Sequence, residues 1–422
     1  MTRKIIKQIG LSLIIASIVL NPFTIARIFS LDNDISNHLV TLAIILFEII
    51  ILLSGAFFYF MEINKKEYLK NILLLFLSVF ILILVMECVF RIFYPQPIGI
   101  STTDNFHLKM HPPNQSTIYQ TSEFRTSLKF NSWGLRDKEY SLQKSKNMFR
   151  ILILGDSYTE ALQVNLSNIY TELLEEKLNK ISNISFEVIN SGVSGFGTAD
   201  ELKYLETKGL NLNPDMIILQ FTLGNDVIDN VYDNNFYYIK NSNILNKTYK
   251  KKYAHKIEDF FGSYSHFAQF LRLSLRKKFS SSKEEWERKS IEYHEVIYKK
   301  KSEEDLQKEW NETRLYLKKI NNICNDKKIR FAIIFVPLNL HITSEEYDAN
   351  NAYPNNVLLD FGKEEKIKML DLTPTFRAES KGNLSLVRWV IDSHWRPKPH
   401  QWAADAIYNF LIEEKLINIK EN

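Results

Sequence analysis

The apolar residues of this chain follow two different patterns, one before residue 95 and one after it. Before residue 95, three long runs are almost wholly apolar, over residues 5–29, 39–61 and 69–92. About 20 consecutive apolar residues are enough for a helix to cross a bilayer. Three such runs in tandem are hard to bury inside a soluble core, so the pattern predicts about three transmembrane helices that anchor the chain, with the lipid bilayer as a partner.

The basic residues beside these runs predict the orientation of the helices. Cytoplasmic connections of membrane proteins carry an excess of Lys and Arg. The basic residues gather at the N-terminus and in the second connection: Arg3, Lys4, Lys7, Lys65, Lys66 and Lys70. The first connection has none after Arg27. Residues 96–422 are therefore expected outside the cytoplasmic membrane, on the periplasmic side or at the cell surface. Cleavage of the first run as a signal peptide would leave that expectation unchanged.

After residue 148 the pattern changes to short apolar runs that alternate with amphipathic segments. Strands are predicted at residues 149–154, 186–189, 216–221, 331–336 and 369–372. Helices are predicted at residues 168–180, 199–208, 303–324 and 402–415. Strands and helices in alternation indicate an α/β fold with a parallel sheet and helices on both faces. Ligands of such sheets bind at the carboxyl ends of the strands.

Two segments do not follow the alternation. Residues 96–148 are polar and rich in turn formers, and we interpret them as a linker and an irregular lead-in to the domain at 149–415. Residues 227–301 interrupt the domain as an aromatic and basic insert, with sixteen Lys or Arg against seven Asp or Glu between Lys240 and Lys301. The amphipathic stretch at 260–279 is interpreted either as a helix on anionic lipid or acidic glycan, or as a cap helix packed on the sheet.

Composition adds little to this picture. The net charge is +4 over 422 residues, which says little about partners, and we expect no nucleic-acid partner. The two cysteines are too few for a disulfide framework, and no Cys or His cluster has the spacing of a zinc site. The glycines of 194–198 do not form a dinucleotide fingerprint. We therefore expect neither a metal nor an organic cofactor.

Four short polar blocks lie where predicted strands end or beside the last helix. They are Gly155-Asp156-Ser157, Asn190-Ser191-Gly192-Val193-Ser194-Gly195, Gly224-Asn225-Asp226 and Asp392-Ser393-His394. Each block alone is compatible with an ordinary turn, because Gly, Asx and Ser are the common turn residues. Their joint occurrence at one edge of a parallel sheet is more specific, and it indicates a catalytic site.

These residue types fit nucleophilic catalysis. A serine hydroxyl needs a base to take its proton, and histidine is the usual base. A carboxylate on the other ring nitrogen fixes the tautomer of the imidazole. We therefore predict Ser157 as nucleophile, His394 as base and Asp392 as its acidic partner. The backbone N–H groups of Ser157 and Gly195 and the side-chain amide of Asn225 are the predicted donors to an oxyanion.

The four blocks resemble those of the SGNH (or GDSL) hydrolase superfamily over roughly residues 125–415. That resemblance implies a three-layer α/β/α sandwich with a flavodoxin-like sheet, and it assigns the same roles to Ser157, Gly195, Asn225, Asp392 and His394. The segment Asn131-Ser-Trp-Gly-Leu-Arg-Asp137 is similar to one that often precedes the serine block in extracytoplasmic members. No Gly-x-Ser-x-Gly elbow is present, which argues against the α/β-hydrolase fold.

One departure from the superfamily concerns the spacing of acid and base. Many secreted members place the acid three residues before the histidine, whereas Asp392 precedes His394 by two. The form Asp392-Ser-His-Trp395 resembles the variant found in polysaccharide-modifying members. His400 is a rival base, which we interpret as structural.

Two classes of function follow. The first is a membrane-anchored serine esterase acting on O-acyl groups of extracytoplasmic polysaccharide, with O-acetyl transfer to the same substrates and hydrolysis of lipid esters as alternatives. The second is a non-catalytic scaffold in an envelope polysaccharide complex. The complete set of Ser157, Asp392 and His394 favours the enzyme, because an idle site has no physical need for all three.

Overall fold

The computed structural model describes residues 2–19, 38–60, 68–93, 102–103, 108–121, 123–181, 183–232, 237–240, 243–246, 265–271, 306–345, 348 and 352–417. Most of the insert predicted at 227–301 lies outside these residues. The chain divides into two compact units. The first comprises residues 1–99, 118–122 and 252–280, and the second comprises the remainder. Each unit is described by itself.

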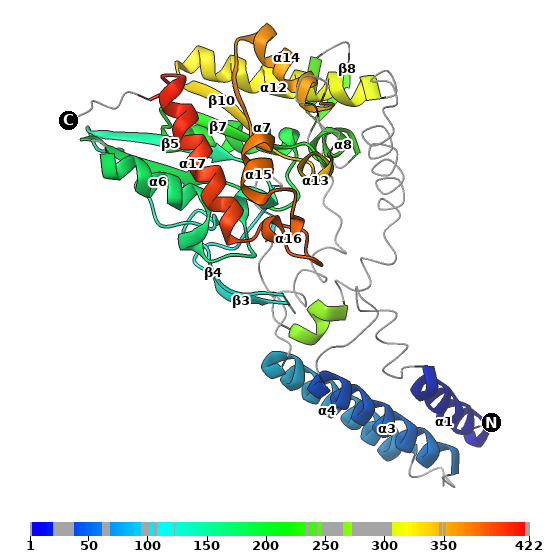
Figure 1. The fold of residues 1–422 in the computed structure, drawn as a ribbon. Helices are drawn as coiled ribbons and strands as arrows, with labels where there is room; N and C mark the ends of the chain where they lie inside the picture. The colour runs from blue at the N-terminus through cyan, green and yellow to red at the C-terminus, as the bar shows by residue number, and fades with distance from the viewer. Residues whose placement is uncertain are drawn as a thin grey trace. The chain divides into compact units, whose positions relative to one another are not determined.

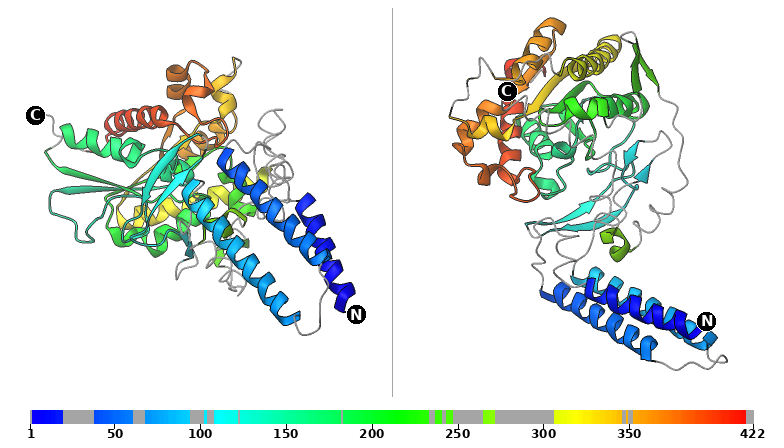
Figure 2. Two further views of the ribbon diagram at one scale, coloured as in Figure 1. Left: turned by 90° about the horizontal axis from the view of Figure 1, so that it is seen from below. Right: turned by 90° about the vertical axis from the view of Figure 1, so that its right-hand side faces the viewer.

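Helices occupy the three apolar runs of the first unit. They are α1 (Thr2–Val19), α3 (His38–Phe60) and α4 (Tyr68–Phe93), and Figure 2 shows them side by side. Among the described residues, one stretch, Leu73–Phe93, is long and apolar enough to cross a membrane. The number of spans and their orientation stay predictions.

Two glycines set the close packing of α1 on α3. A Cβ added at Gly10 would lie 2.7 Å from the carbonyl oxygen of Gly55, and one at Gly55 would lie 2.9 Å from the carbonyl oxygen of Gly10. The two backbones therefore meet where neither residue has a side chain. Small residues at helix contacts are typical of helices that pack within a membrane.

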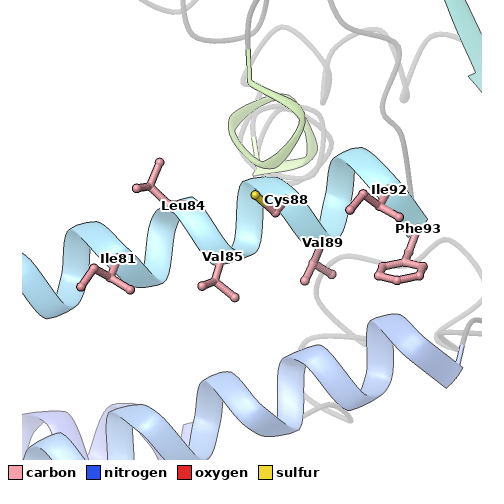
Figure 3. A pocket seen from close by; sticks show the side chains of 7 residues that line it. All are labelled: Ile81, Leu84, Val85, Cys88, Val89, Ile92 and Phe93. Carbon is pink, nitrogen blue, oxygen red and sulfur yellow. The ribbon is translucent and has the colours of Figure 1, made fainter.

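Near its C-terminal end, α4 holds a described piece of the insert. The Glu87 carboxylate accepts hydrogen bonds from Ser265 Oγ (2.8 Å), from the His266 N–H (3.1 Å) and from the Phe267 N–H (3.0 Å). Phe90 contacts the rings of Phe267 and Phe270. This part of the amphipathic stretch thus packs on a helix of the apolar region. A shallow pocket on α4 is lined by apolar side chains and one cysteine: Ile81, Leu84, Val85, Cys88, Val89, Ile92 and Phe93 (Figure 3).

The second unit is built on a five-stranded parallel sheet with the order β11-β10-β7-β5-β6. Figure 1 labels its three central strands, β10, β7 and β5. Its strands are β5 (Met148–Leu154), β6 (Ser185–Asn190), β7 (Met216–Thr222), β10 (Arg330–Val336) and β11 (Lys368–Asp371). All five predicted strands are present, with no end shifted by more than one residue. The order in which the chain visits the strands is that of flavodoxin-like sheets.

Alternate residues of the strands enter two separate hydrophobic cores. Leu152 of β5 packs with the helices on one face, whereas Ile151 packs with those on the other face. The first face is covered by α7 (Thr198–Thr207), α12 (Gln307–Lys327) and α14 (Asn355–Glu365). The second is covered by α6 (Tyr170–Ile181), α15 (Thr373–Ser380) and α17 (Pro397–Glu413). The predicted α/β/α sandwich is therefore confirmed.

The strand order creates a switch point between β5 and β7. From β5 the chain moves to β6 on one side and then returns to β7 on the other side. The loops after β5 and β7 therefore diverge at their carboxyl ends. Ligands of open α/β sheets bind in the crevice at such a point. Ser157 lies three residues after the end of β5 and the loop of Asn225 follows β7, so both are at this end of the sheet.

The lead-in before β5 contains short strands that its polar pattern did not predict. They are β1 (Thr102–Thr103), β2 (Lys109–Met110), β3 (Ser116–Gln120) and β4 (Arg125–Lys129). Within β4, buried residues alternate with exposed ones, and Leu128 is fully buried. Part of the lead-in is thus an integral part of the domain. Two short strands of the insert, β8 (Tyr237–Lys240) and β9 (Asn243–Asn246), form an antiparallel pair.

Gly192, in the loop after β6, allows that loop to lie against the turn after β5. The Val193 N–H donates to the Gly155 carbonyl at 3.1 Å. A Cβ added at Gly192 would lie 2.6 Å from the Thr159 Cβ. Gly192→Ala should therefore lower the stability of the domain by about 1–3 kcal/mol through overpacking.

Thermal unfolding of the full-length chain tests this expectation. Gly224→Ala is the matched control, because a Cβ at Gly224 meets no atom closer than 3.8 Å. The Gly192 variant should melt at a lower temperature than both the wild type and the control. Equal melting temperatures for the two variants would contradict the proposed close approach.

Candidate active site

Ser157 lies at the start of a short helix directly after β5. Helix α5 (Ser157–Glu160) begins at Ser157, with Asp156 as its N-cap, whose carboxylate accepts from the Tyr158 N–H at 2.9 Å. The first N–H groups of a helix have no partner within the helix. The turn therefore presents the Ser157 hydroxyl together with a backbone donor. Gly155 lets Gln220 lie close to this turn, because a Cβ at position 155 would lie 2.7 Å from Gln220 Oε1.

Asp392 and His394 come from the loop between α16 (Leu384–Val387) and α17. His394 Nδ1 lies 2.7 Å from Asp392 Oδ1, and His394 Nε2 lies 2.8 Å from Ser157 Oγ. The spacing of two residues is met by Ser393, whose φ of 71° is in the left-handed region. The structure thus brings the three residues together in one hydrogen-bonded series, in the geometry of a base that is oriented by an acid.

The environment of His394 changes its protonation. Burial alone would lower the pKa of the imidazole, but the hydrogen bond and negative charge of Asp392 outweigh it, and Asp156 adds to them. The pKa of His394 is therefore raised above its ordinary value of 6.5. The Tyr158 ring, with its centroid 5.1 Å from that of His394, covers the imidazole.

Gly195 follows β6 in the loop that contacts the serine turn. Its φ is +82°, a conformation that favours glycine. Glu160 holds the preceding residue, because its carboxylate accepts from the Ser194 N–H at 2.7 Å and from the Ser194 hydroxyl. Glu160 is fully buried and paired with His111, and despite its burial these contacts lower its pKa to about 2.

Lys109 contacts the same loop at the carbonyl side of the peptide group between Ser194 and Gly195. Its Nζ donates to the Ser194 carbonyl oxygen at 2.7 Å. Because a trans peptide group is planar, the N–H of Gly195 points away from that oxygen. A cation at the carbonyl oxygen also polarises the peptide and strengthens its N–H as a donor. Glu160 and Lys109 thus fix both the position and the direction of the Gly195 N–H.

Asn225 lies in the turn between β7 and α8 (Asp226–Tyr232). Its amide donates one hydrogen bond to Asp229 Oδ2 at 2.6 Å, and the second amide hydrogen remains for another acceptor. Within the described part of the chain, no hydrogen bond joins Gly195 or Asn225 to Ser157, His394 or Asp392. The roles of Gly195 and Asn225 as donors to an oxyanion stay predictions.

Three buried carboxyls lie beneath these loops: Asp156, Glu201 and Asp226. Burial and their mutual repulsion raise the pKa of Glu201 and Asp226, and burial raises that of Asp156. Asp156 Oδ2 accepts from Thr222 Oγ1 at 2.8 Å, which ties the serine turn to the end of β7. No sequence motif indicated Glu201, which α7 contributes to this group. Neither these three carboxyls nor any other group of His, Cys, Asp or Glu among the described residues could hold a metal ion.

The lead-in segment supports the serine turn directly. Arg136 is buried and donates to the carbonyl oxygens of Glu160 (2.9 Å), Ala161 and Val164. The last carbonyl groups of a helix lack partners within the helix, so the guanidinium satisfies the end of α5. Asp137 accepts from the Asn190 N–H at 2.7 Å, at the end of β6. These contacts show what the lead-in does, which its sequence alone did not show.

His400 occupies a different environment from His394. It is buried against Trp395 and Tyr170, with ring centroids 5.4 Å and 6.2 Å away. Burial, together with the charges of Arg136 and His394, lowers its pKa to about 3. A ring that is neutral and enclosed in this way serves packing, in line with its interpretation as a structural residue.

Comparisons with known proteins were made with both sequence and structure. No protein-family model matches the chain, and no curated protein matches it. Forty-seven solved chains match in structure. They include the acetyl xylan esterase AlAXEase (14% identity, TM-score 0.35), TesA (13%, 0.36) and a lipase/acylhydrolase from Enterococcus faecalis (14%, 0.35). These matches cover 62%, 62% and 65% of this chain and 98%, 97% and 100% of theirs.

The raised pKa of His394 leads to a testable pH dependence. Only the neutral imidazole can accept the Ser157 proton, and the neutral fraction grows as the pH rises through the pKa. Labelling of Ser157 by a fluorophosphonate should therefore accelerate with pH, with a midpoint above 6.5. Asp392→Asn removes the charge that raises the pKa, so its midpoint should lie lower. Equal midpoints in the two proteins, or a rate independent of pH between about 5 and 9, would contradict this.

Proposed function

We propose that this chain is a serine esterase of the SGNH type that hydrolyses O-acyl groups through an acyl-Ser157 intermediate. The observation that carries the proposal is the hydrogen-bonded series from Ser157 Oγ to His394 Nε2 (2.8 Å) and from His394 Nδ1 to Asp392 Oδ1 (2.7 Å). A serine that is already hydrogen-bonded to an oriented base is ready to act as a nucleophile. The four sequence blocks, in their order along the chain, support the same conclusion.

In the first half-reaction, Ser157 Oγ attacks the carbonyl carbon of the ester. The hydroxyl proton passes to His394 Nε2, and the carbonyl oxygen becomes an oxyanion. The N–H groups of Ser157 and Gly195 and the amide of Asn225 are proposed to donate to it. The C–O bond of the ester then breaks, and the departing alcohol takes the proton from His394. The acyl group remains on Ser157, and Asp392 stabilises the transient imidazolium.

In the second half-reaction, water attacks the acyl-Ser157 ester. His394 takes a proton from that water and returns it to Ser157 Oγ as the acyl–serine bond breaks. The products are the free carboxylic acid and the original enzyme. A sugar hydroxyl in place of water would give O-acyl transfer by the same steps. The form Asp392-Ser-His-Trp395, which resembles polysaccharide-modifying members, favours transfer as the second candidate.

The proposed substrate is an O-acylated polysaccharide outside the cytoplasmic membrane. The Asp392-Ser-His-Trp395 form supports the substrate class. The apolar helix Leu73–Phe93 supports a membrane anchor, and the basic residues of the N-terminal connections support an extracytoplasmic domain. An enzyme anchored in this way would act on glycan of the cell envelope or on exported glycan.

Acetyl release by the full-length chain in detergent tests the proposal. The protein is incubated with a small acetyl ester, with and without an oligosaccharide, and both free acetate and acetylated sugar are measured. We expect acetate release, and Ser157→Ala should reduce it on the order of 10⁴-fold, because nucleophile and base act as a unit. Its melting temperature should stay close to that of the wild type. Acetylated sugar as the main product would favour the transferase.

Ser167→Ala is the matched control, since Ser167 is exposed in the 3-10 turn Leu166–Asn168. That variant should keep wild-type activity. Wild-type rates in the folded Ser157→Ala variant would overturn the mechanism. A wild-type chain that releases no acetate and is not labelled at Ser157 would favour the scaffold hypothesis instead.

A further inference from the structure

The acid and the base of the site lie on a loop whose tip is exposed. Val390 and Ile391, directly before Asp392, are 74% and 44% exposed. The base of this loop is closed by a bridge between Arg388 and Trp395 and by the Trp389 N–H, which donates to the His394 carbonyl at 2.9 Å. These contacts, together with the Ser393 N–H that donates to the Trp389 carbonyl oxygen at 3.1 Å, hold Ser393 and His394 but not the backbone of Val390, Ile391 and Asp392. Catalytic groups need positions fixed to within about 0.5 Å, so the other half of the loop needs a support of its own.

Glu123 supplies contacts to that half of the loop. Its Oε1 accepts from the Val390 N–H at 2.6 Å, and its Oε2 accepts from the N–H groups of Ile391 (3.0 Å) and Asp392 (2.8 Å). Three consecutive backbone donors therefore converge on one carboxylate. Successive N–H groups in a turn form a concavity that binds an anion. Hydrogen bonds to an ionised acceptor are roughly twice as strong as neutral ones.

The neighbours of this contact reinforce it. Phe124 follows Glu123 in the sequence, and Trp389 precedes Val390. The ring centroids of Phe124 and Trp389 lie 5.7 Å apart. The Arg396 guanidinium also contacts Trp389, 4.4 Å from its ring centroid. Glu123 precedes β4, within the lead-in to the domain. The loop is thus held by a segment some 270 residues earlier in the chain, which no local motif indicated.

We propose that Glu123 is a positioning residue for the acid–base pair. Its carboxylate fixes the backbone of Asp392, Asp392 orients His394 through the 2.7 Å contact, and His394 reaches Ser157 at 2.8 Å. The inference rests on the proposed function, because it assigns Glu123 a role in serine activation. Glu123 acts through the loop and touches no reacting atom.

Loss of Glu123 should affect the titration of His394 in a defined direction. The charged or titratable groups that act on this ring are Asp392, Asp156, Tyr158 and His400, and Arg388 holds the intervening Ser393 through its hydroxyl. Asp392 contributes most to raising the pKa. Without Glu123, Asp392 is free to leave its 2.7 Å contact, so the pKa of His394 should fall toward its ordinary value.

Two variants of the full-length chain test the proposal. Glu123→Ala removes the carboxylate that accepts all three backbone hydrogen bonds, whereas Glu123→Gln keeps an amide oxygen that can still accept. Glu379→Ala is the control, since Glu379 is exposed on α15. The readouts are the fluorophosphonate labelling rate of Ser157 against pH, kcat and KM for a small acetyl ester, and the melting temperature.

We expect Glu123→Ala to lower kcat and the labelling rate on the order of ten- to a hundredfold, as a misplacement of about 1 Å does. KM should change little, and the labelling midpoint should move to lower pH. Glu123→Gln should lie between Ala and wild type, and the control should match wild type. If the Glu123→Ala variant does not fold, the labelling midpoint of the Glu123→Gln variant tests the proposal.

Two results separate the explanations. An unchanged midpoint in a folded Glu123 variant would overturn the proposal, whether or not the rate falls, because a purely structural defect lowers the rate without moving the pKa of His394. A wild-type chain that is labelled at Ser157 but releases no acid from esters would refute the proposed esterase. In that case the labelling midpoints would still test Glu123.

Discussion

The site depends on one hydrogen bond, between the Ser157 hydroxyl and His394 Nε2, whose residues lie 237 positions apart in the chain. Ser157 reaches this place because β5 ends in a turn at the switch point of the sheet. His394 reaches it because a loop before α17 folds back over the same edge. Neither residue is chemically unusual alone. The contact between Ser157 and His394, together with the contact between His394 and the Asp392 carboxylate, makes a candidate catalytic unit from two loop segments.

Much of the surrounding structure serves to keep that edge of the sheet rigid. Each loop at the edge is tied to a neighbour: Asp156 to Thr222, Val193 to Gly155, and Asp137 to the end of β6. Buried charged side chains also hold these loops, because each can make several hydrogen bonds. The buried Arg136 closes the end of α5, and the buried Glu160 holds the loop of Gly195. Removing one partner from such a buried charged contact would leave the other uncompensated, which is strongly destabilising.

The sequence predicted the sheet and the polar blocks for a physical reason. Buried parallel strands are runs of apolar residues, and the residues that begin the next loop stand at the same end of every strand, as Ser157 and Asn225 do. The supporting residues could not be predicted in this way. Arg136, Lys109 and Glu123 act across the lead-in, whose short strands lack a strong apolar pattern, and their partners are backbone groups that leave no mark in the sequence.

The central claim is that Ser157 carries the acyl group during turnover. Its most direct test is an acid quench of the full-length chain during reaction with an activated acetyl ester, followed by peptide mapping by mass spectrometry. The account predicts an acetyl group on the peptide that contains Ser157, absent when His394 is replaced by Ala. Turnover with no acetylated Ser157 peptide, or with the acetyl group on another residue, would contradict it.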